Sequence, residues 1–472
     1  MTTTGSAPET MFESRFAALD GLSLIDTIVN RRSRRFALGN ELDGGPLSYR
    51  SAHEPVPLTA EEEAIIVFAG AGLTGFSFAE GPYAPGSEPE SSSANIIVTP
   101  FGRTIASPDG INTSILFVIN DDGAFQIRRP QDYPRESIAE LGELARRHEF
   151  VELYDRAKIR VSDHRLEVLR RPPFTPPFNR WNANVPGSTY FVLISDVTPL
   201  ILSLLLFLLN EEMGVCLFDD RNHYRPAGLK RFMRSKGGHL YDDPNDFRVG
   251  SILDFESYIM ELLGVEQGLM LQNLQLAVEG LGLGGFPHFG AQKYQWFEAL
   301  GFRMEDVSIA QLTRRARVVT AAMNALGKNP IIPHPLGLEV DGEVTVKPYC
   351  PPWYGSMEEA VHAFVENKYG EDGIFTDGRS GAWRDTAGVQ AGIQHYSQAN
   401  IDAVVAYCEY VYRRYGRFPG YFAPLRSLMA YQAHHVDMDF YDRFYEPGAY
   451  RDLHREHFAR WHGENGTGSS ES

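Results

Sequence analysis

Cysteine is scarce in this chain of 472 residues, and its spacing excludes two kinds of stabilising site. Cys216, Cys350 and Cys408 lie far apart, with no Cys-x-x-Cys pair among them. A disulfide framework needs a set of paired cysteines, and a thiolate zinc site needs closely spaced ones, so neither is predicted. We therefore expect a cytoplasmic protein of a reducing compartment.

A long uninterrupted apolar run is also missing. The most apolar stretch, residues 190–209, contains Asp196 and Pro199. Its continuous apolar part is much shorter than the roughly 20 residues of a membrane-spanning helix. The N-terminus lacks the basic start and apolar run of a signal peptide. We predict instead a buried strand at Tyr190–Ile194, a buried helix from about Thr198, and no membrane partner.

Basic residues are too few to balance the acidic ones. The chain has 44 Lys and Arg against 61 Asp and Glu, a net charge of −17. General affinity for nucleic acids or anionic lipids comes from a basic surface, so neither is an expected partner. Any anion must therefore bind in a local basic pocket. The hydrophobic fraction of 43% is typical of a globular protein with a substantial core.

Several catalytic motifs are absent as well. There is no Gly-x-Ser-x-Gly elbow and no phosphate-binding P-loop. The sequence GLGLGG at 280–285 is not followed by the second strand and acidic residue of a dinucleotide-binding unit. Hydrolase, kinase and dinucleotide-fold functions are therefore not predicted.

Local patterns predict an α+β fold. Capping boxes at Thr59–Glu62 and Ser356–Glu359 mark two helix starts, and Asp121–Gly123 is typical of a hairpin turn. The predicted helices are Phe16–Phe36, the segment from Thr59, Phe255–Leu283, the segment from Ser356 and Ala399–Tyr415; the predicted strands are Asn95–Thr99, Ile115–Asn120 and Ala124–Arg128. We expect disordered ends at 1–15 and 463–472, a main domain at 16–354 and a mostly helical C-terminal extension at 355–462.

The segment Arg31-Arg-Ser-Arg-Arg35 carries the most informative chemistry. If the preceding helix continues through it, Arg31 and Arg35 share one face and repel each other. An anion between them would reverse that repulsion. Guanidinium forks suit phosphate, and the Ser33 hydroxyl adds a donor. The alternative is a solvated basic patch, because the helix dipole favours cations at a C-terminus.

Arg-Arg-Ser-x-Arg after an N-terminal helix resembles the FMN-phosphate motif of the nitroreductase family. LTAEEEAIIVFAGAGLTG at 58–75 is similar to the next helix in its SagB-like, azoline-oxidising branch. GRTIASPDGINTSILFVIN at 102–120 resembles the family's serine-rich turn and asparagine before a central strand. LQNLQLAVEGLGLGG at 271–285 resembles its long helix. The resemblance covers roughly residues 20–350, with 121–250 poorly matched.

The resemblance implies a nitroreductase-like mixed sheet flanked by helices, an FMN cofactor and a homodimer. Hydride would pass between the flavin and a small-molecule or peptide-derived substrate, with NAD(P)H as reductant or dioxygen as acceptor. By resemblance, the phosphate and ribityl chain would be held by Arg31, Arg32, Ser33 and Arg35. The ribityl chain or the polar ring edge would meet Ser107 and Asn112, and the ring would lie against Gly284, Gly285 and Phe286.

No catalytic residue is predicted. His288, Lys293 and Tyr294 are candidates to donate a proton over the flavin, with loop packing as the alternative role. A basic pair expected near the end of the domain has candidates by composition only, in Arg314, Arg315 and Arg317.

Two other functions stay open. The family's Gln-Pro-Trp is replaced by Thr113-Ser114-Ile115, which leaves a non-catalytic binding protein of this fold as an alternative. The other is a metal-dependent enzyme using the C-terminal segment AHHVDMDFYDRFY. The candidate ligands there are His434, His435, Asp437, Asp439, Asp442, His454 and His457. No established metal-ligand spacing is present, so a metal site is not predicted. Adjacent His434 and His435 are expected to point to different faces.

Overall fold

The computed structural model describes residues 23–78, 96–288, 293–313 and 315–462. Arg314 and the ends predicted to be disordered lie outside the described residues. The helices are α2 (Leu24–Asn30), α3 (Ala60–Ala71), α4 (Ile138–Arg146), α5 (Phe150–Ala157), α6 (Thr198–Leu208), α7 (Ile252–Gly280), α8 (Lys293–Ala299), α9 (Ile309–Leu312), α10 (Arg317–Ala325), α11 (Met357–Tyr369), α12 (Thr386–Ala391), α13 (Gln398–Tyr415), α14 (Met438–Phe444) and α15 (Asp452–His462).

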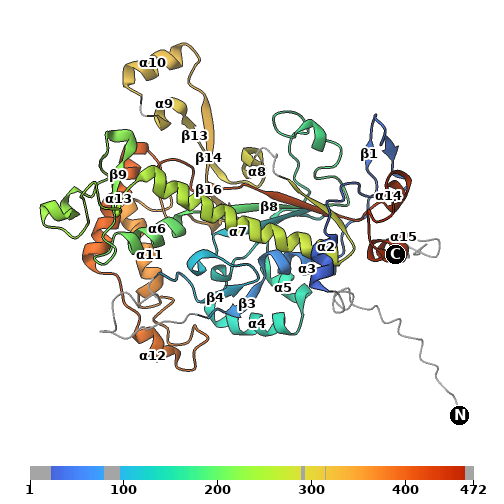
Figure 1. Ribbon diagram of the computed structural model, residues 1–472, viewed down its shortest axis with the longest axis horizontal. Coiled ribbons are helices and arrows are strands. Elements are labelled where there is room, and N and C mark those ends of the chain that lie inside the picture. Colours follow the sequence, from blue (N-terminus) through green and yellow to red (C-terminus); the bar gives the residue numbers. More distant parts are fainter. Residues whose placement is uncertain (1–22, 79–95, 289–292, 314, 463–472) are drawn as a thin grey trace.

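The main sheet lies at the centre of the fold and has seven strands. Its order is β12 (Gly284–His288), β17 (Ala430–His434), β8 (Thr189–Asp196), β5 (Ser114–Asn120), β6 (Gly123–Ile127) and β7 (Lys158–Ser162), with β16 (Leu425–Arg426) also on β8. The fold is therefore α+β, with a central sheet flanked by helices (Figure 1).

The expected mixing of strand directions does not occur within this sheet, where every pairing is antiparallel. A parallel pair lies instead in a small sheet, between β9 (Cys216–Asp219) and β11 (Val249–Ser251). For β5 and β6 the physical reason is the tight turn that joins them, because only antiparallel neighbours can be joined by a hairpin. The remaining strands are β1 (Glu41–Leu42), β2 (Tyr49–Arg50), β3 (Leu73–Phe76), β4 (Phe101–Arg103), β10 (Arg225–Pro226), β13 (Arg303–Ser308), β14 (Ile331–Val340) and β15 (Glu343–Val346).

Both faces of the sheet are buried. On β5, Leu116 and Val118 pack into the layer formed by α3, α4, α5 and α7, whereas Ile115 and Phe117 pack toward α8 and β14. Successive side chains of a strand point to opposite faces, so a strand covered on both sides has no polar face. This explains the continuous apolar runs of β5 and β8.

A second core lies beside the sheet, around α6, α11, α13 and the first half of α7. The strand predicted at Tyr190–Ile194 and the helix predicted from Thr198 are confirmed as β8 and α6. Within the described residues, no helix combines the length and apolar character needed to cross a membrane.

The segment after residue 355 is mostly helical, as expected, but it also completes the main sheet. Both β16 and β17 pair with β8, and β17 separates β8 from β12. The boundary expected at residue 354 therefore does not coincide with a break in the sheet.

One predicted strand is absent. The described part of Asn95–Thr99 belongs to no strand. This segment instead forms hydrogen bonds to the turn at residues 109–110. Val98 N donates to the Asp109 carbonyl at 2.8 Å, and Thr99 Oγ1 donates to the Gly110 carbonyl at 2.6 Å.

Helix α7 has 29 residues and runs through the middle of the molecule (Figure 1). Its Glu266 side chain is 1% exposed and accepts hydrogen bonds from Ser107 Oγ at 2.7 Å, Thr113 Oγ1 at 3.0 Å and Ser114 N at 2.6 Å. These bonds replace the water that the carboxylate loses on burial. They fasten α7 to the start of β5.

Replacement of Glu266 by glutamine tests this anchor. The amide keeps the shape but loses the charge and one acceptor, so at least one buried donor is left without a partner. We expect the free energy of unfolding to fall by about 2–3 kcal/mol in urea titration. Glu261→Gln, at an exposed position of the same helix, is expected to change it by less than about 0.5 kcal/mol. Equal effects of the two variants would contradict the anchoring role.

Candidate functional site

The Arg31–Arg35 segment does not continue α2, which corrects the expected shared helix face. The helix ends at Asn30, and Arg31 is its extended C-cap, with ψ 122°. The chain leaves the helix because its arginines bond α7. Arg31 Nη1 donates to Gln275 Oε1 at 2.8 Å, and Arg34 Nη1 forms a buried ion pair with Glu279 Oε2 at 2.6 Å.

Alternate side chains are buried in the extended segment that follows. Arg34 and Phe36 are 2% and 1% exposed, whereas Ser33 is exposed and Arg35 is half-buried. Arg32 is exposed, and its guanidinium donates to the Val29 carbonyl at 3.0 Å. The ion pair of Arg34 thus directs Ser33 and Arg35 to the opposite side of the segment.

Arg35 lies in a pocket of aromatic and amide groups. Its guanidinium is 5.0 Å from the Phe286 ring centre and 5.5 Å from that of Trp181. Its Nη2 donates to Asn179 Oδ1 at 2.5 Å and to the Phe178 carbonyl at 3.0 Å. Burial lowers the pKa of Arg35. The buried Nε atom has no hydrogen-bond partner among the described residues, so the guanidinium still has a donor to offer.

Gly284 and Gly285 lie in β12 rather than at the end of α7. A Cβ atom on Gly284 would lie 2.8 Å from His434 Nε2, and one on Gly285 would lie 2.2 Å from Tyr431 Oη. Contacts this short are not tolerated, so packing within the protein by itself requires glycine at both positions. Contact of these glycines with a flavin stays a prediction.

His288 ends β12 and bonds Asn179 of the Arg35 pocket and Tyr190 of β8. Asn179 Nδ2 donates to His288 Nε2 at 2.5 Å, which leaves the proton of a neutral ring on Nδ1, 2.6 Å from Tyr190 Oη. Burial, followed by the charge of Arg35, lowers the pKa of His288 to about 4. Of the other proton-donor candidates, Tyr294 is half-buried in α8 and the side chain of Lys293 lies outside the described part.

Ser107 and Asn112 lie together, but away from the arginine segment. Asn112 N donates to Ser107 Oγ at 2.8 Å, and Ser107 Oγ donates to Glu266. Glu266 precedes Gln275, the partner of Arg31, by nine residues, which corresponds to about 14 Å along α7. One chain therefore does not bring the eight predicted cofactor residues to one place.

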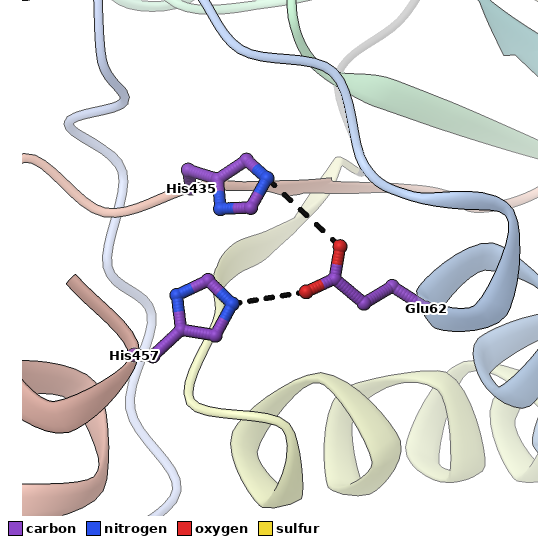
Figure 2. A group of neighbouring side chains, drawn as sticks. All are labelled: Glu62, His435 and His457. Atoms are coloured by element: carbon purple, nitrogen blue, oxygen red, sulfur yellow. Dashed lines mark hydrogen bonds and ion pairs between the residues drawn. The ribbon is translucent and has the colours of Figure 1, made fainter. Parts of the chain in front are cut away.

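The C-terminal histidines converge on a residue that was not expected there. His457 Nε2 is 2.9 Å from Glu62 Oε1, and His435 Nε2 is 3.9 Å from Glu62 Oε2 (Figure 2). The sequence marked Glu62 only as the capping residue of α3, a role it also fulfils through Thr59. No local signal connects position 62 to positions 435 and 457, so sequence reasoning missed this group.

The other C-terminal candidates have separate surroundings. Asp437 and Asp439 gather with His53 into a second group of close ligand atoms. Asp442 forms an ion pair with Arg455 at 3.0 Å, and His454 Nε2 is 3.9 Å from Glu279 Oε2. His434 faces Gly284. His434 and His435 thus point to different sides, as predicted.

The carboxylate of Glu62 is ionised at neutral pH although it is buried. Burial alone would raise the pKa of Glu62, but the hydrogen bond from His457 and the charges of His435 and His457 lower it to about 2. A buried carboxylate facing two imidazoles is a donor set that suits hydrogen bonding or a divalent cation.

Comparisons with known proteins identify no family for this chain. No protein-family model and no curated protein matches it in sequence. Among solved structures, it is similar to a candidate nitroreductase from Ralstonia eutropha JMP134, at 12% identity and a TM-score of 0.27. The match covers 63% of this chain and 80% of the other. At this TM-score the likeness carries no functional assignment.

The buried neutral ring of His288 makes stability depend on pH. The unfolded chain binds a proton on this ring near pH 6.5, whereas the folded protein does so only near pH 4. The stabilisation is complete above pH 6.5 and is lost as the pH falls from 6.5 toward 4. Between about pH 7.5 and 4.5, we expect the wild type to lose about 2 kcal/mol more unfolding free energy than His288→Gln does.

Urea titrations at several pH values provide the measurement. His164→Gln serves as the control, because His164 is exposed and its side chain contacts the adjacent Ser162 and Asp163. It should lose stability as the wild type does. If His288→Gln has the same pH dependence as the wild type, the folded ring takes up its proton at the same pH as the unfolded chain does, and its burial as a neutral group is wrong.

Proposed function

We propose that this chain is an FMN-dependent oxidoreductase of the nitroreductase type, similar to the SagB-like branch, acting on a small-molecule or peptide-derived substrate. The observation that carries the proposal is the segment at residues 31–35. Within an acidic protein, it offers the cations of Arg31, Arg32 and Arg35 and the hydroxyl of Ser33, while Arg34 alone is bound in a fully buried ion pair. Guanidinium and hydroxyl donors of this kind suit a phosphate monoester.

The residues fit one end of FMN better than the other. Arg31, Arg32 and Ser33 are at least partly exposed, and Arg35 has a spare donor, so a phosphate can be held there. The space beside Gly284 and Gly285 is filled by the protein's own side chains. The phosphate end therefore fits this chain, whereas the two glycines do not supply an open face for the ring.

A homodimer would bring the two predicted groups of cofactor residues closer together. The outer face of α7 exposes Tyr258, Val265 and Leu269, which are 50%, 59% and 39% exposed. The neighbouring α2 exposes Leu24, Ile25, Ile28 and Val29. Several large apolar side chains exposed on two neighbouring helices are typical of a subunit interface. We propose that two copies pair across α7, with the arginine segment of one approaching the Ser107 turn of the other.

When bound, FMN supplies the hydride-transfer chemistry, with NAD(P)H as a candidate reductant. The chain's own residues bind and orient it. His288 is not assigned as a proton donor, because its low pKa keeps the ring neutral at pH 7 and its Nδ1 proton is directed to Tyr190. The three cysteines are buried and form no disulfide, which supports a cytoplasmic location.

Loss of Arg31 or Arg35 is expected to weaken FMN binding. A charge-assisted hydrogen bond contributes about 1.5–3 kcal/mol, so Arg31→Ala and Arg35→Ala should each raise the Kd for FMN by roughly 10- to 100-fold. The measurement is titration of the full chain with FMN, followed by flavin fluorescence, together with an absorbance spectrum from about 300 to 600 nm. Circular dichroism confirms that each variant is folded.

Arg50→Ala is the matched control, because Arg50 is an exposed arginine whose bond to Glu41 lies on β1–β2. Its Kd should stay within about twofold of the wild type. If Arg31→Ala and Arg35→Ala bind FMN as the wild type does, the phosphate assignment is wrong. A colourless wild type that binds no added FMN would favour a non-catalytic binding protein instead.

A charge on the outer face of α7 is expected to separate the dimer. Val265→Glu or Leu269→Glu would bury a carboxylate in an apolar interface, so both should sediment as monomers at concentrations where the wild type is a dimer. Val318→Glu is the control, because Val318 is 82% exposed on α10, in the projecting arm away from α7 (Figure 1). A monomeric wild type, or a dimer that persists in both α7 variants, would contradict this interface.

A further inference from the structure

Three elements that are distant in sequence place metal-ligating atoms in one small space. Glu62 is in the first turn of α3, His435 follows β17 directly, and His457 lies on α15. Their side chains point toward one another (Figure 2). One ligand atom from each residue lies within 4.8 Å of the other two.

The spacing of these atoms suits one small divalent cation. Zinc binds imidazole nitrogen and carboxylate oxygen at about 2.0–2.2 Å, so the ligands of a tetrahedral ion lie about 3.3 Å apart. The distances from His457 Nε2 and His435 Nε2 to the nearest Glu62 carboxylate oxygen, 2.9 and 3.9 Å, lie on either side of that value. Both histidines direct Nε2 toward the carboxylate, so both present the same ring atom to a shared centre.

A further oxygen borders the same space. His435 Nε2 donates a hydrogen bond to the carbonyl oxygen of Pro57 at 3.1 Å. Binding of an ion displaces that proton, after which the Pro57 oxygen can complete a set of two nitrogens and two oxygens. Nitrogen and carboxylate ligands together favour zinc and similar transition metals over calcium or magnesium, which prefer oxygen alone.

The group is enclosed by the protein. The side chains of Glu62 and His435 are 0% and 2% exposed, and that of His457 is 11% exposed. The imidazole rings of His435 and His457 stack with centres 5.0 Å apart. A dry, preformed set of ligands loses little conformational freedom when an ion binds, and the partly exposed His457 leaves a route of entry.

We propose that Glu62, His435 and His457 bind one divalent transition-metal ion of the zinc class, which fastens α15 to α3 and to the end of β17. This site is independent of the proposed FMN function. Its role is structural, because the ligands come from three elements that are distant in sequence and an ion held between them would tie these elements together. It differs from the metal centre first considered for the C-terminal segment by recruiting Glu62.

The test is direct zinc binding by the full chain. Protein freed of metal with a chelator is titrated with Zn²⁺ in competition with a chromophoric zinc indicator, and its Tm is measured with and without Zn²⁺. The wild type is expected to bind one ion per chain and to gain several degrees in Tm. Glu62→Gln and His457→Gln should each weaken binding at least 100-fold and abolish the gain in Tm.

The variants separate the metal site from other roles of the same residues. Glutamine at position 62 still completes the capping box with Thr59, so Glu62→Gln removes the charged ligand and retains the helix cap. His362→Gln, at an exposed position of α11, is the matched histidine control and should bind like the wild type. Asp439→Asn tests the neighbouring group of His53, Asp437 and Asp439 and should also leave binding unchanged.

Three results would overturn the proposal. The first is a wild type that binds no Zn²⁺ at micromolar concentrations. The second is a His457→Gln variant that binds as the wild type does, which would leave only hydrogen bonds between these residues. The third is loss of binding in Asp439→Asn with retention in His457→Gln, which would place the ion in the neighbouring group.

Discussion

Buried carboxylates along α7 hold remote parts of the chain in register. Glu256 accepts hydrogen bonds from two backbone amides at residues 420–421, Glu266 binds the turn before β5, and Glu279 binds Arg34. These carboxylates are 10 and 13 residues apart, which corresponds to about 15 and 20 Å along the helix. A carboxylate out of water must be satisfied by fixed donors, so each one allows a single position for the segment that it binds.

This arrangement determines where an anion can be held. Because Arg34 forms an ion pair with Glu279, the segment after Asn30 cannot continue as helix. The other side-chain donors of residues 31–35 face away from that ion pair. Ser107 binds Glu266 and accepts a hydrogen bond from Asn112, so these two predicted cofactor residues lie further toward the start of α7. The helix therefore separates the two groups within one chain. A second copy of the chain, packed on the exposed Val265 and Leu269 of α7, would lie beside both the arginine segment and the Ser107 turn.

The sequence predicted the elements that local signals define. Both predicted capping segments begin helices, although only Thr59 and Glu62 form the full reciprocal box, and the Asp121–Gly123 turn joins two strands. These signals act within a few residues. Strand β17 was missed because Ala430–His434 is short and carries polar and histidine residues. It becomes a strand through pairing with β8 and β12, which are remote in sequence.

The site was predictable only in part, for the same reason. The composition of residues 31–35 identified anion-binding chemistry, but the end of α2 at Asn30 follows from bonds to α7 that no local pattern encodes. The approach of Glu62 to His435 and His457 likewise depends on the fold of the whole chain. Only the opposed directions of His434 and His435 followed from strand geometry alone.

That opposition links the two inferred sites through one stretch of backbone. His434 lies against Gly284 on one side, and His435 faces Glu62 on the other. The backbone beyond them pairs with the end of the arginine segment, because Leu38 N donates to the His435 carbonyl and Asp437 N donates to that of Phe36, both at 3.2 Å. An ion held by His435 would therefore also fix the strand that supports Arg35. The C-terminal helix thus connects to the arginine segment through the backbone that follows β17, and also through His454, whose Nε2 is 3.9 Å from Glu279, the partner of Arg34.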